Sequence, residues 1–197
     1  MSQMSLASST NNMSEGIRLI EIPKTDFHLR RMMADHYSAP LGFVGRSICY
    51  LVMFGDSLYG GIVGGSATLH LPGRNEYFGI DKTNLRGVVN NLFYHVNPLV
   101  NGYPTRNFTT KVLTAWRERI AVDWERKYGD PVMGFESLVE LPRTGECYRR
   151  DGWERIGQTV GYTCKRTKGK GTDSWSGRRI WDTKNLRPKL VFVRDFD

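Results

Sequence analysis

The side chains best suited to moving protons fall in two groups that are far apart in the sequence. The first is His36 beside Tyr37, an imidazole next to a phenol. Imidazole accepts a proton near neutral pH, and a phenol donates a hydrogen bond to a developing negative charge. The second group is Glu136, which follows a short apolar run, and Tyr148, which follows a Pro/Gly-bearing turn. These side chains suit a reaction in which a chemical group is transferred to a nucleophile that must lose a proton. His36 or Glu136 would be the base that accepts this proton.

Each group also has an ordinary structural interpretation. His36 could cap a preceding helix while Tyr37 packs against a sheet. Glu136 could be a solvated acid on a strand–loop–strand unit. Both interpretations remain open from the sequence alone. No CxxC or CxxH pair is present, and no spacing of ligands predicts a metal site.

A third site is expected where the longest helix begins. Apolar residues recur at helical spacing over about Asn107–Tyr128, and Thr105 or Asn107 could cap this helix. The first turn carries hydroxyls and Lys111 but no acid, so its backbone N–H groups could bind a phosphate. The expected cofactor contacts are Asn91, Thr105, Arg106, Asn107 and Thr109. There are two alternatives to a cofactor site. The helix could simply begin here without binding an anion, and the Asn91 amide could be paired within the protein for structural reasons.

The chain has 197 residues and 40% hydrophobic side chains, enough for one domain with a core. Residues 1–14 have neither a basic head nor an apolar core, so they predict a disordered lead-in rather than a secretory signal. The remaining residues, 15–197, are expected to form a single domain. Three widely spaced cysteines favour a reducing, intracellular compartment. No run approaches the roughly 20 apolar residues of a membrane span, so no membrane partner is expected.

The elements that must position these groups follow from periodicity and turn residues. Strands are expected at Ile17–Ile22, Ser47–Phe54, Leu58–Thr68, Val88–Val96, Pro131–Phe135, Arg155–Tyr162 and Lys189–Val193. Helices are expected at Phe27–Ala34, Asn107–Tyr128 and Cys147–Asp151, with Asp26 capping the first. This order predicts an α+β fold with a central, mostly antiparallel sheet flanked by helices.

The formal net charge of +8 favours a polyanionic partner, although acidic membrane surfaces and cofactor phosphates would also suit it. A flexible basic loop is expected over residues 163–181, where tryptophans lie among the cations. The expected nucleic-acid contacts are Arg149, Arg150, Lys165, Arg166, Lys168 and Lys170. A solvated loop without a partner is the alternative.

The element order resembles the GCN5-related N-acetyltransferase (GNAT) fold. The resemblance implies that residues 97–111 hold the pyrophosphate of coenzyme A. The Arg/Gln-x-x-Gly-x-Gly/Ala loop of that family is missing, and Gly102 is the glycine that precedes the helix. The implied cofactor is acetyl-coenzyme A or another activated acyl or aminoacyl donor.

A closer resemblance is to phage DNA-modification proteins of the Mom type. It is carried by His36-Tyr37-Ser38, Asn91, Glu136, the stretch from Gly145 to Tyr148, Gly152-Trp153 and Gly157. It implies a transferase in the host cytoplasm that converts adenine in double-stranded DNA to N6-carbamoylmethyladenine and thereby protects the DNA against restriction. The target base would be flipped out, with Tyr37, Tyr148 or Trp153 to hold it. The alternatives are an acyltransferase acting on a protein or small amine, and a non-catalytic DNA-binding module.

Overall fold

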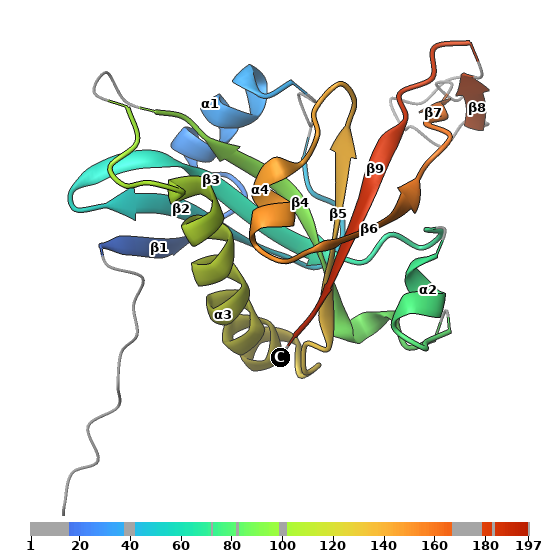
Figure 1. Ribbon diagram of the computed structural model, residues 1–197, viewed down its shortest axis with the longest axis horizontal. Helices are drawn as coiled ribbons and strands as arrows, with labels where there is room; N and C mark the ends of the chain where they lie inside the picture. The colour runs from blue at the N-terminus through green and yellow to red at the C-terminus, as the bar shows by residue number, and fades with distance from the viewer. Residues whose placement is uncertain are drawn as a thin grey trace, which may run out of the picture.

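The computed structural model describes residues 16–37, 42–71, 73–81, 83–98, 102–166, 179–182 and 184–196 (Figure 1). The expected lead-in, residues 1–14, lies outside this range. So do Lys168 and Lys170 of the expected basic loop.

A seven-stranded sheet runs through the molecule in the order β1-β2-β3-β4-β5-β9-β6. Its strands are β1 (Ile17–Ile22), β2 (Ser47–Phe54), β3 (Ser57–Ser66), β4 (Val88–Val96), β5 (Gly134–Glu140), β9 (Lys189–Asp195) and β6 (Glu154–Gln158). Neighbouring strands are antiparallel except β4 and β5, which are parallel and joined by a helical crossover. The expectation of a mostly antiparallel sheet is therefore confirmed.

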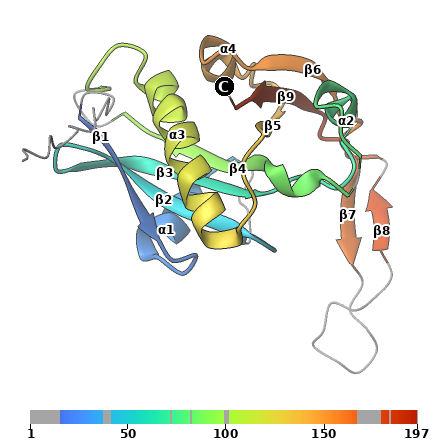
Figure 2. The same cartoon turned by 90° about the horizontal axis from the view of Figure 1, so that it is seen from below.

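Helices cover both faces of the sheet. They are α1 (Phe27–Asp35), α2 (Arg74–Tyr77), α3 (Phe108–Tyr128) and α4 (Glu146–Arg150), with a 3-10 turn at Leu85–Gly87. Figure 2 shows α3 and α4 on one face and α1 on the other. Asp26 caps α1 as expected, since its carboxylate accepts a hydrogen bond from the backbone N–H of Leu29 at 3.0 Å.

Two apolar clusters form the core, one on each face. The larger joins α3 to the sheet through a fully buried stripe that includes Trp116 and Ile120. The smaller holds α1 to the other face through Leu29 and Met33. The apolar period of α3 predicted this buried stripe, and the helix begins within one residue of the expected position.

The β4 and β5 strands separate halfway along their length. They pair over four residues, from Val88 opposite Gly134 to Asn91 opposite Ser137, although both strands continue beyond this point. The register between β3 and β4 also shifts there, because Phe93 faces Val63 while Asn91 faces Gly64. Such a bulge bends the strand and changes which face its side chains occupy. The sheet therefore opens between β4 and β5.

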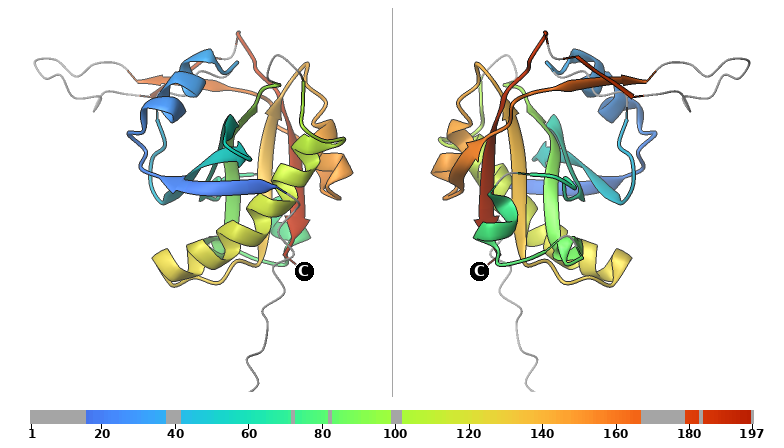
Figure 3. Two further views of the ribbon diagram at one scale, coloured as in Figure 1. Left: turned by 90° about the vertical axis from the view of Figure 1, so that its left-hand side faces the viewer. Right: turned by 90° about the vertical axis from the view of Figure 1, so that its right-hand side faces the viewer.

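Two parts of the chain differ from expectation. No helix or strand was predicted between Thr68 and Val88, but this segment contains α2, a helix too short to show periodicity. The expected basic loop contains two strands, β7 (Thr163–Arg166) and β8 (Arg179–Asp182), which pair as an antiparallel ribbon. Figures 2 and 3 show this β7–β8 ribbon projecting from the body of the molecule. The expectation of a flexible loop is therefore wrong where β7 and β8 lie within residues 163–181, because each strand pairs with the other.

Candidate active site

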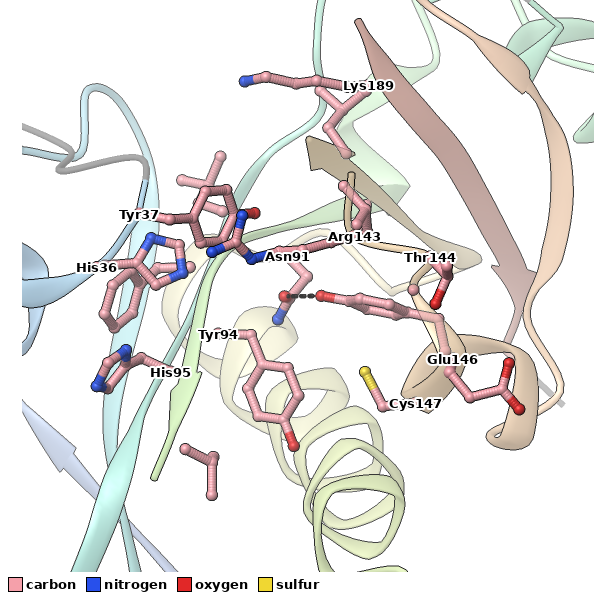
Figure 4. Close-up of a pocket in the computed structure, with 18 of the residues that line it drawn as sticks. His36, Tyr37, Asn91, Tyr94, His95, Arg143, Thr144, Glu146, Cys147 and Lys189 are labelled. Atoms are coloured by element: carbon pink, nitrogen blue, oxygen red, sulfur yellow. Dashed lines mark hydrogen bonds between the residues drawn. The ribbon is translucent and has the colours of Figure 1, made fainter. Parts of the chain in front are cut away.

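A cavity of about 800 Å³ lies where β4 and β5 separate. Its walls come from the facing edges of these strands, the loop before α4 and the residues at the end of α1 (Figure 4). The polar and aromatic residues in its wall are Asp35, His36, Tyr37, Thr68, Asn90, Asn91, Phe93, Tyr94, His95, Asn97, Ser137, Arg143, Thr144, Glu146, Cys147, Tyr148 and Lys189. A cavity of this size can hold a ligand as large as a nucleoside or a cofactor arm.

His36 and Tyr37 straddle the gap between the two strands. His36 forms a hydrogen bond with the backbone of Tyr94 on β4, and Tyr37 forms one with the backbone of Glu140 at the end of β5. The two rings lie 4.1 Å apart, centroid to centroid. The dipeptide that follows α1 therefore spans the opening of the sheet. This places the first group of predicted catalytic residues in the cavity wall.

The imidazole of His36 is neutral at physiological pH. Burial, with smaller contributions from the nearby His95 and Arg143, lowers the pKa of His36 to about 4 against the opposing effect of its hydrogen bond to the backbone of Tyr94. Burial also lowers the pKa of His95, whose ring lies 5.7 Å from that of His36. A neutral imidazole can accept a proton, so His36 enters a reaction in the form that a base requires.

Arg143 stacks on Tyr37 at the mouth of the cavity. Its guanidinium carbon lies 3.5 Å from the centre of the phenol ring, as Figure 4 shows. Within the described part of the chain, no carboxylate forms an ion pair with Arg143 or with Lys189, the other cation in the wall. By contrast, the acids Asp35 and Glu146 are each paired with arginines. The two acids in the wall are therefore paired with arginines, whereas its two cations, Arg143 and Lys189, form no ion pair with a carboxylate of the described residues.

Glu136 was expected as a possible base together with His36, but it does not line the cavity that holds His36 and Tyr37. Its side chain is fully buried, where it forms an ion pair with the equally buried Arg74 and accepts a hydrogen bond from the backbone N–H of Thr68 at 2.5 Å. Alternation along β5 explains the error, since Ser137 and Glu136 point to opposite faces of the sheet. Burial raises the pKa of Glu136, because loss of hydration outweighs the attraction of the guanidinium.

Tyr148 lies in the wall but is almost fully buried, and its hydroxyl donates a hydrogen bond to Asn91 Oδ1 at 2.8 Å. Trp153 packs in the core against Phe135 and donates a hydrogen bond to Asp151, so neither ring offers an open face to a base. Of the three predicted stacking residues, Tyr37 alone is substantially exposed, at 37%. Tyr37 therefore remains the candidate platform for a planar ligand.

The start of α3 lies beside the cavity. Tyr94, in the wall, donates a hydrogen bond from its hydroxyl to the backbone oxygen of Thr109 at 2.6 Å. The expected cap is absent, because Asn107 has a left-handed backbone and its side chain does not cap the first turn. The first N–H groups of a helix have no partner within it, so this end attracts an anion. Arg106 and Lys111 add positive charge, and the buried Thr105 hydroxyl has no partner among the described residues.

The predicted nucleic-acid contacts are distributed over two regions. Arg149 and Arg150 on α4 are exposed and form ion pairs with Glu146. Lys165 and Arg166 lie on β7, whose pairing with β8 places Arg166 opposite Arg179. The β7–β8 ribbon begins beside the cavity. Thr159, shortly before β7 in the chain, donates a backbone hydrogen bond to the carbonyl oxygen of Lys189, which lines the cavity.

Sequence reasoning missed Arg143, Lys189, Tyr94 and His95. Arg143 follows a proline in a turn, which is a signal for a loop but not for a binding site. Tyr94 and His95 lie on β4 beyond the point where it separates from β5, and Lys189 lies on β9 opposite Glu140; sequence patterns do not reveal these strand pairings. Among the described residues, no group of three metal-ligating side chains is brought together. None of the helices described is long and apolar enough to span a membrane.

Neither a protein-family model nor a curated protein sequence matches the chain. Solved structures of acetyltransferases do match it. An aminoglycoside acetyltransferase in complex with coenzyme A and kanamycin is 15% identical, with 91% of this chain and 94% of that chain covered and a TM-score of 0.54. A Bacillus subtilis acetyltransferase in complex with coenzyme A is 13% identical, with 91% and 99% covered and a TM-score of 0.52.

A third alignment is with the acetyl transferase from Salmonella typhimurium that modifies the N-terminal serine of ribosomal protein L7/L12. It is 10% identical and covers 78% of this chain and 66% of that chain, at a TM-score of 0.44. That score is too low to support a structural argument. The first two alignments show that the chain has a GNAT-like α+β fold, as the element order predicted.

Proposed function

We propose that this protein is a transferase that modifies the exocyclic amine of adenine in double-stranded DNA, using an activated donor held between β4 and β5. The observation that carries the proposal is the cavity at this opening, where a neutral imidazole meets a stacked phenol–guanidinium pair and a second cation, Lys189. The fold is that of proteins crystallised with coenzyme A, which favours an acyl-coenzyme A type of donor.

The residues present fit such a donor. The start of α3, with Thr105, Arg106, Asn107 and Thr109, would hold a pyrophosphate. The facing edges of β4 and β5 do not pair with each other beyond Asn91 and Ser137, so their backbone groups could bond the amides of an extended arm. When bound, the donor would supply an electrophilic carbon with a leaving group.

His36 suits the role of proton acceptor for the attacking amine. An exocyclic amine on adenine is a weak nucleophile that must lose a proton as it attacks, and a neutral imidazole can accept it. Glu136 is the weaker candidate, because its carboxylate is already paired with Arg74 and lies outside the cavity wall. Tyr148 would act through Asn91, since its hydroxyl is committed to that amide.

The charge distribution supports DNA as the substrate. Arg143 and Lys189 bring positive charge to the cavity, and the β7–β8 ribbon, with Arg166 opposite Arg179, leaves the body beside it. Such a surface would bind phosphates and release counterions. A base inside the duplex cannot reach a cavity, so it must be flipped out, and Tyr37 offers a stacking face for it. The resemblance to Mom-type proteins names the product, N6-carbamoylmethyladenine, and implies protection of phage DNA against restriction.

The second candidate is transfer to an amine of a protein or small molecule. It is favoured by the likeness to an aminoglycoside acetyltransferase whose structure contains kanamycin, an amine-bearing ligand. The positive charge at this cavity argues against a polycationic acceptor. A DNA-binding protein without catalytic activity would not need a neutral imidazole in a cavity, and its DNA affinity would be indifferent to loss of His36 and Tyr37.

The test is mass spectrometry of nucleosides from plasmid DNA of cells that express the chain. We expect a modified adenosine with wild type, none with His36→Ala, and an unchanged amount with His28→Ala, which alters an exposed histidine on α1. Unmodified adenosine with wild type would contradict the proposal, and an acylated protein or small amine in the same cells would support the second candidate.

A further inference from the structure

A buried line of hydrogen bonds ends at the apex of the cavity. Tyr148 donates a hydrogen bond from its hydroxyl to Asn91 Oδ1 at 2.8 Å, the dashed line in Figure 4. Ser137 lies beside the phenol of Tyr148 and interacts with it. The three residues are 1%, 6% and 5% exposed, so water does not compete for these bonds. The line therefore has a fixed geometry inside the protein.

The direction of the line fixes the orientation of the Asn91 amide. Ser137 lies beside the phenol of Tyr148 and lowers the pKa of that phenol against the larger, opposing effect of burial. Tyr148 directs its own proton to the amide oxygen of Asn91. The amide nitrogen, with both of its hydrogens, is left on the other side.

The Asn91 amide nitrogen is buried and has no acceptor among the described residues. A buried donor that is left unpaired is unfavourable, so a buried donor with no acceptor in the protein indicates a partner that is not part of the chain. Asn91 lies in the cavity wall and, opposite Ser137, forms the last pair of β4 with β5 before the strands separate. The unpaired donor therefore sits at the narrow end of the opening.

We propose that Asn91 Nδ2 donates a hydrogen bond to the carbonyl oxygen at the electrophilic carbon of the donor, and that Tyr148 and Ser137 hold the amide in the orientation this requires. The inference rests on the proposed function, which supplies a carbonyl-bearing donor. It gives Tyr148 a positioning role in place of the catalytic role that the sequence suggested.

The hydrogen bond would strengthen during the reaction. As the amine nitrogen forms its bond to the carbonyl carbon, an electron pair moves onto the oxygen and His36 takes the proton of the amine. When the carbonyl re-forms, the leaving group departs with the bonding electron pair and receives the proton from His36, which leaves an N6-acyl group on adenine. An aminoacetyl group attached in this way is an isomer of the carbamoylmethyl group, so a rearrangement would have to follow this step to give the product named above. A hydrogen-bond donor placed at such an oxygen changes the rate of acyl transfer by about 10²–10³-fold in known cases.

The test uses coenzyme A and acetyl-coenzyme A as probes and isothermal titration calorimetry as the readout, with no turnover. These two compounds differ by the carbonyl group that Asn91 would contact. We expect wild type to bind acetyl-coenzyme A about fivefold more tightly, the effect of one net hydrogen bond. Asn91→Leu, similar in size but without a hydrogen-bond donor, should lose this preference and retain its affinity for coenzyme A. Asn84→Leu, at an exposed site, is the matched control.

Tyr148→Phe provides a second variant in case the first does not fold. It keeps the ring in the core, removes the bond that orients the amide, and should reduce the preference. A preference that persists in both variants, or equal affinities in wild type, would overturn the inference and leave the proposed function standing. Binding of neither compound by wild type would overturn the proposed donor and this inference with it.

Discussion

Replacing Glu136 by Gln separates a structural role from a catalytic one. Glu136 and Arg74 are both fully buried, and their ion pair is joined to the backbone N–H and carbonyl of Thr68. Glutamine has almost the same shape but no charge, so the variant leaves the Arg74 guanidinium buried without a counterion. Removing one partner of a buried pair costs about 3–5 kcal/mol.

The loss should be visible in thermal unfolding. For a domain of this size, 1 kcal/mol corresponds to about 2–4 °C in Tm, so Glu136→Gln should melt roughly 6–20 °C below wild type. Replacing both partners with apolar residues, Arg74→Met with Glu136→Leu, should recover most of this loss, because it removes the cost of burying two charges.

Modification of DNA by the folded fraction is the second readout. At a temperature where Glu136→Gln is folded, we expect it to modify adenosine to an extent close to wild type, since the carboxylate lies outside the cavity. The reasoning would be refuted by a variant that melts like wild type but makes no modified adenosine. That result would mean that Glu136 acts on the substrate and not on the fold.

Two further predictions concern His36 and the basic ribbon. Burial lowers the pKa of His36 to about 4, so the NMR titration of this histidine should have a midpoint near pH 4. DNA modification should persist as the pH falls from 7 to 5 and then decline as the imidazole is protonated. A titration midpoint near pH 6.5 would contradict the buried position. Reversing the charges of Lys165 and Arg166 should weaken DNA binding and make it less sensitive to salt. The slope of log affinity against log salt concentration should decrease by about one unit for each phosphate that the protein no longer neutralises. The control Lys127→Glu, at the C-terminal end of α3, should change neither the affinity nor this slope. Equal effects of the two changes would show that the ribbon has no special role.

The elements of the fold were predictable because their signals are local. The β2 strand and its hairpin to β3, the helix capped by Asp26, and the long apolar stripe of α3 follow from β propensity, capping and periodicity. The short α2 helix could not be predicted. The α2 helix is held in place by the buried side chain of Arg74. An arginine can be buried at this position because it pairs with Glu136, which is distant in sequence.

The site was predictable in part. His36, Tyr37 and Asn91 were expected from their chemistry, and all three lie in the cavity wall. The position of Glu136 was not predictable, because which face a strand residue occupies depends on the register of its neighbours. The separation of β4 from β5 also depends on strand register and could not be predicted. For the same reason, the sequence could not predict that the amide nitrogen of Asn91 is buried at the point where the two strands separate.

The central claim is that this chain itself transfers a group to adenine from the cavity between β4 and β5. It is tested most directly by incubating purified protein with unmodified plasmid DNA and the small-molecule fraction of a cell extract as the source of donor. Nucleoside mass spectrometry should then show a modified adenosine that increases with time for wild type and is absent for His36→Ala. Plain adenosine throughout with wild type, or equal modification by His36→Ala, would contradict the claim.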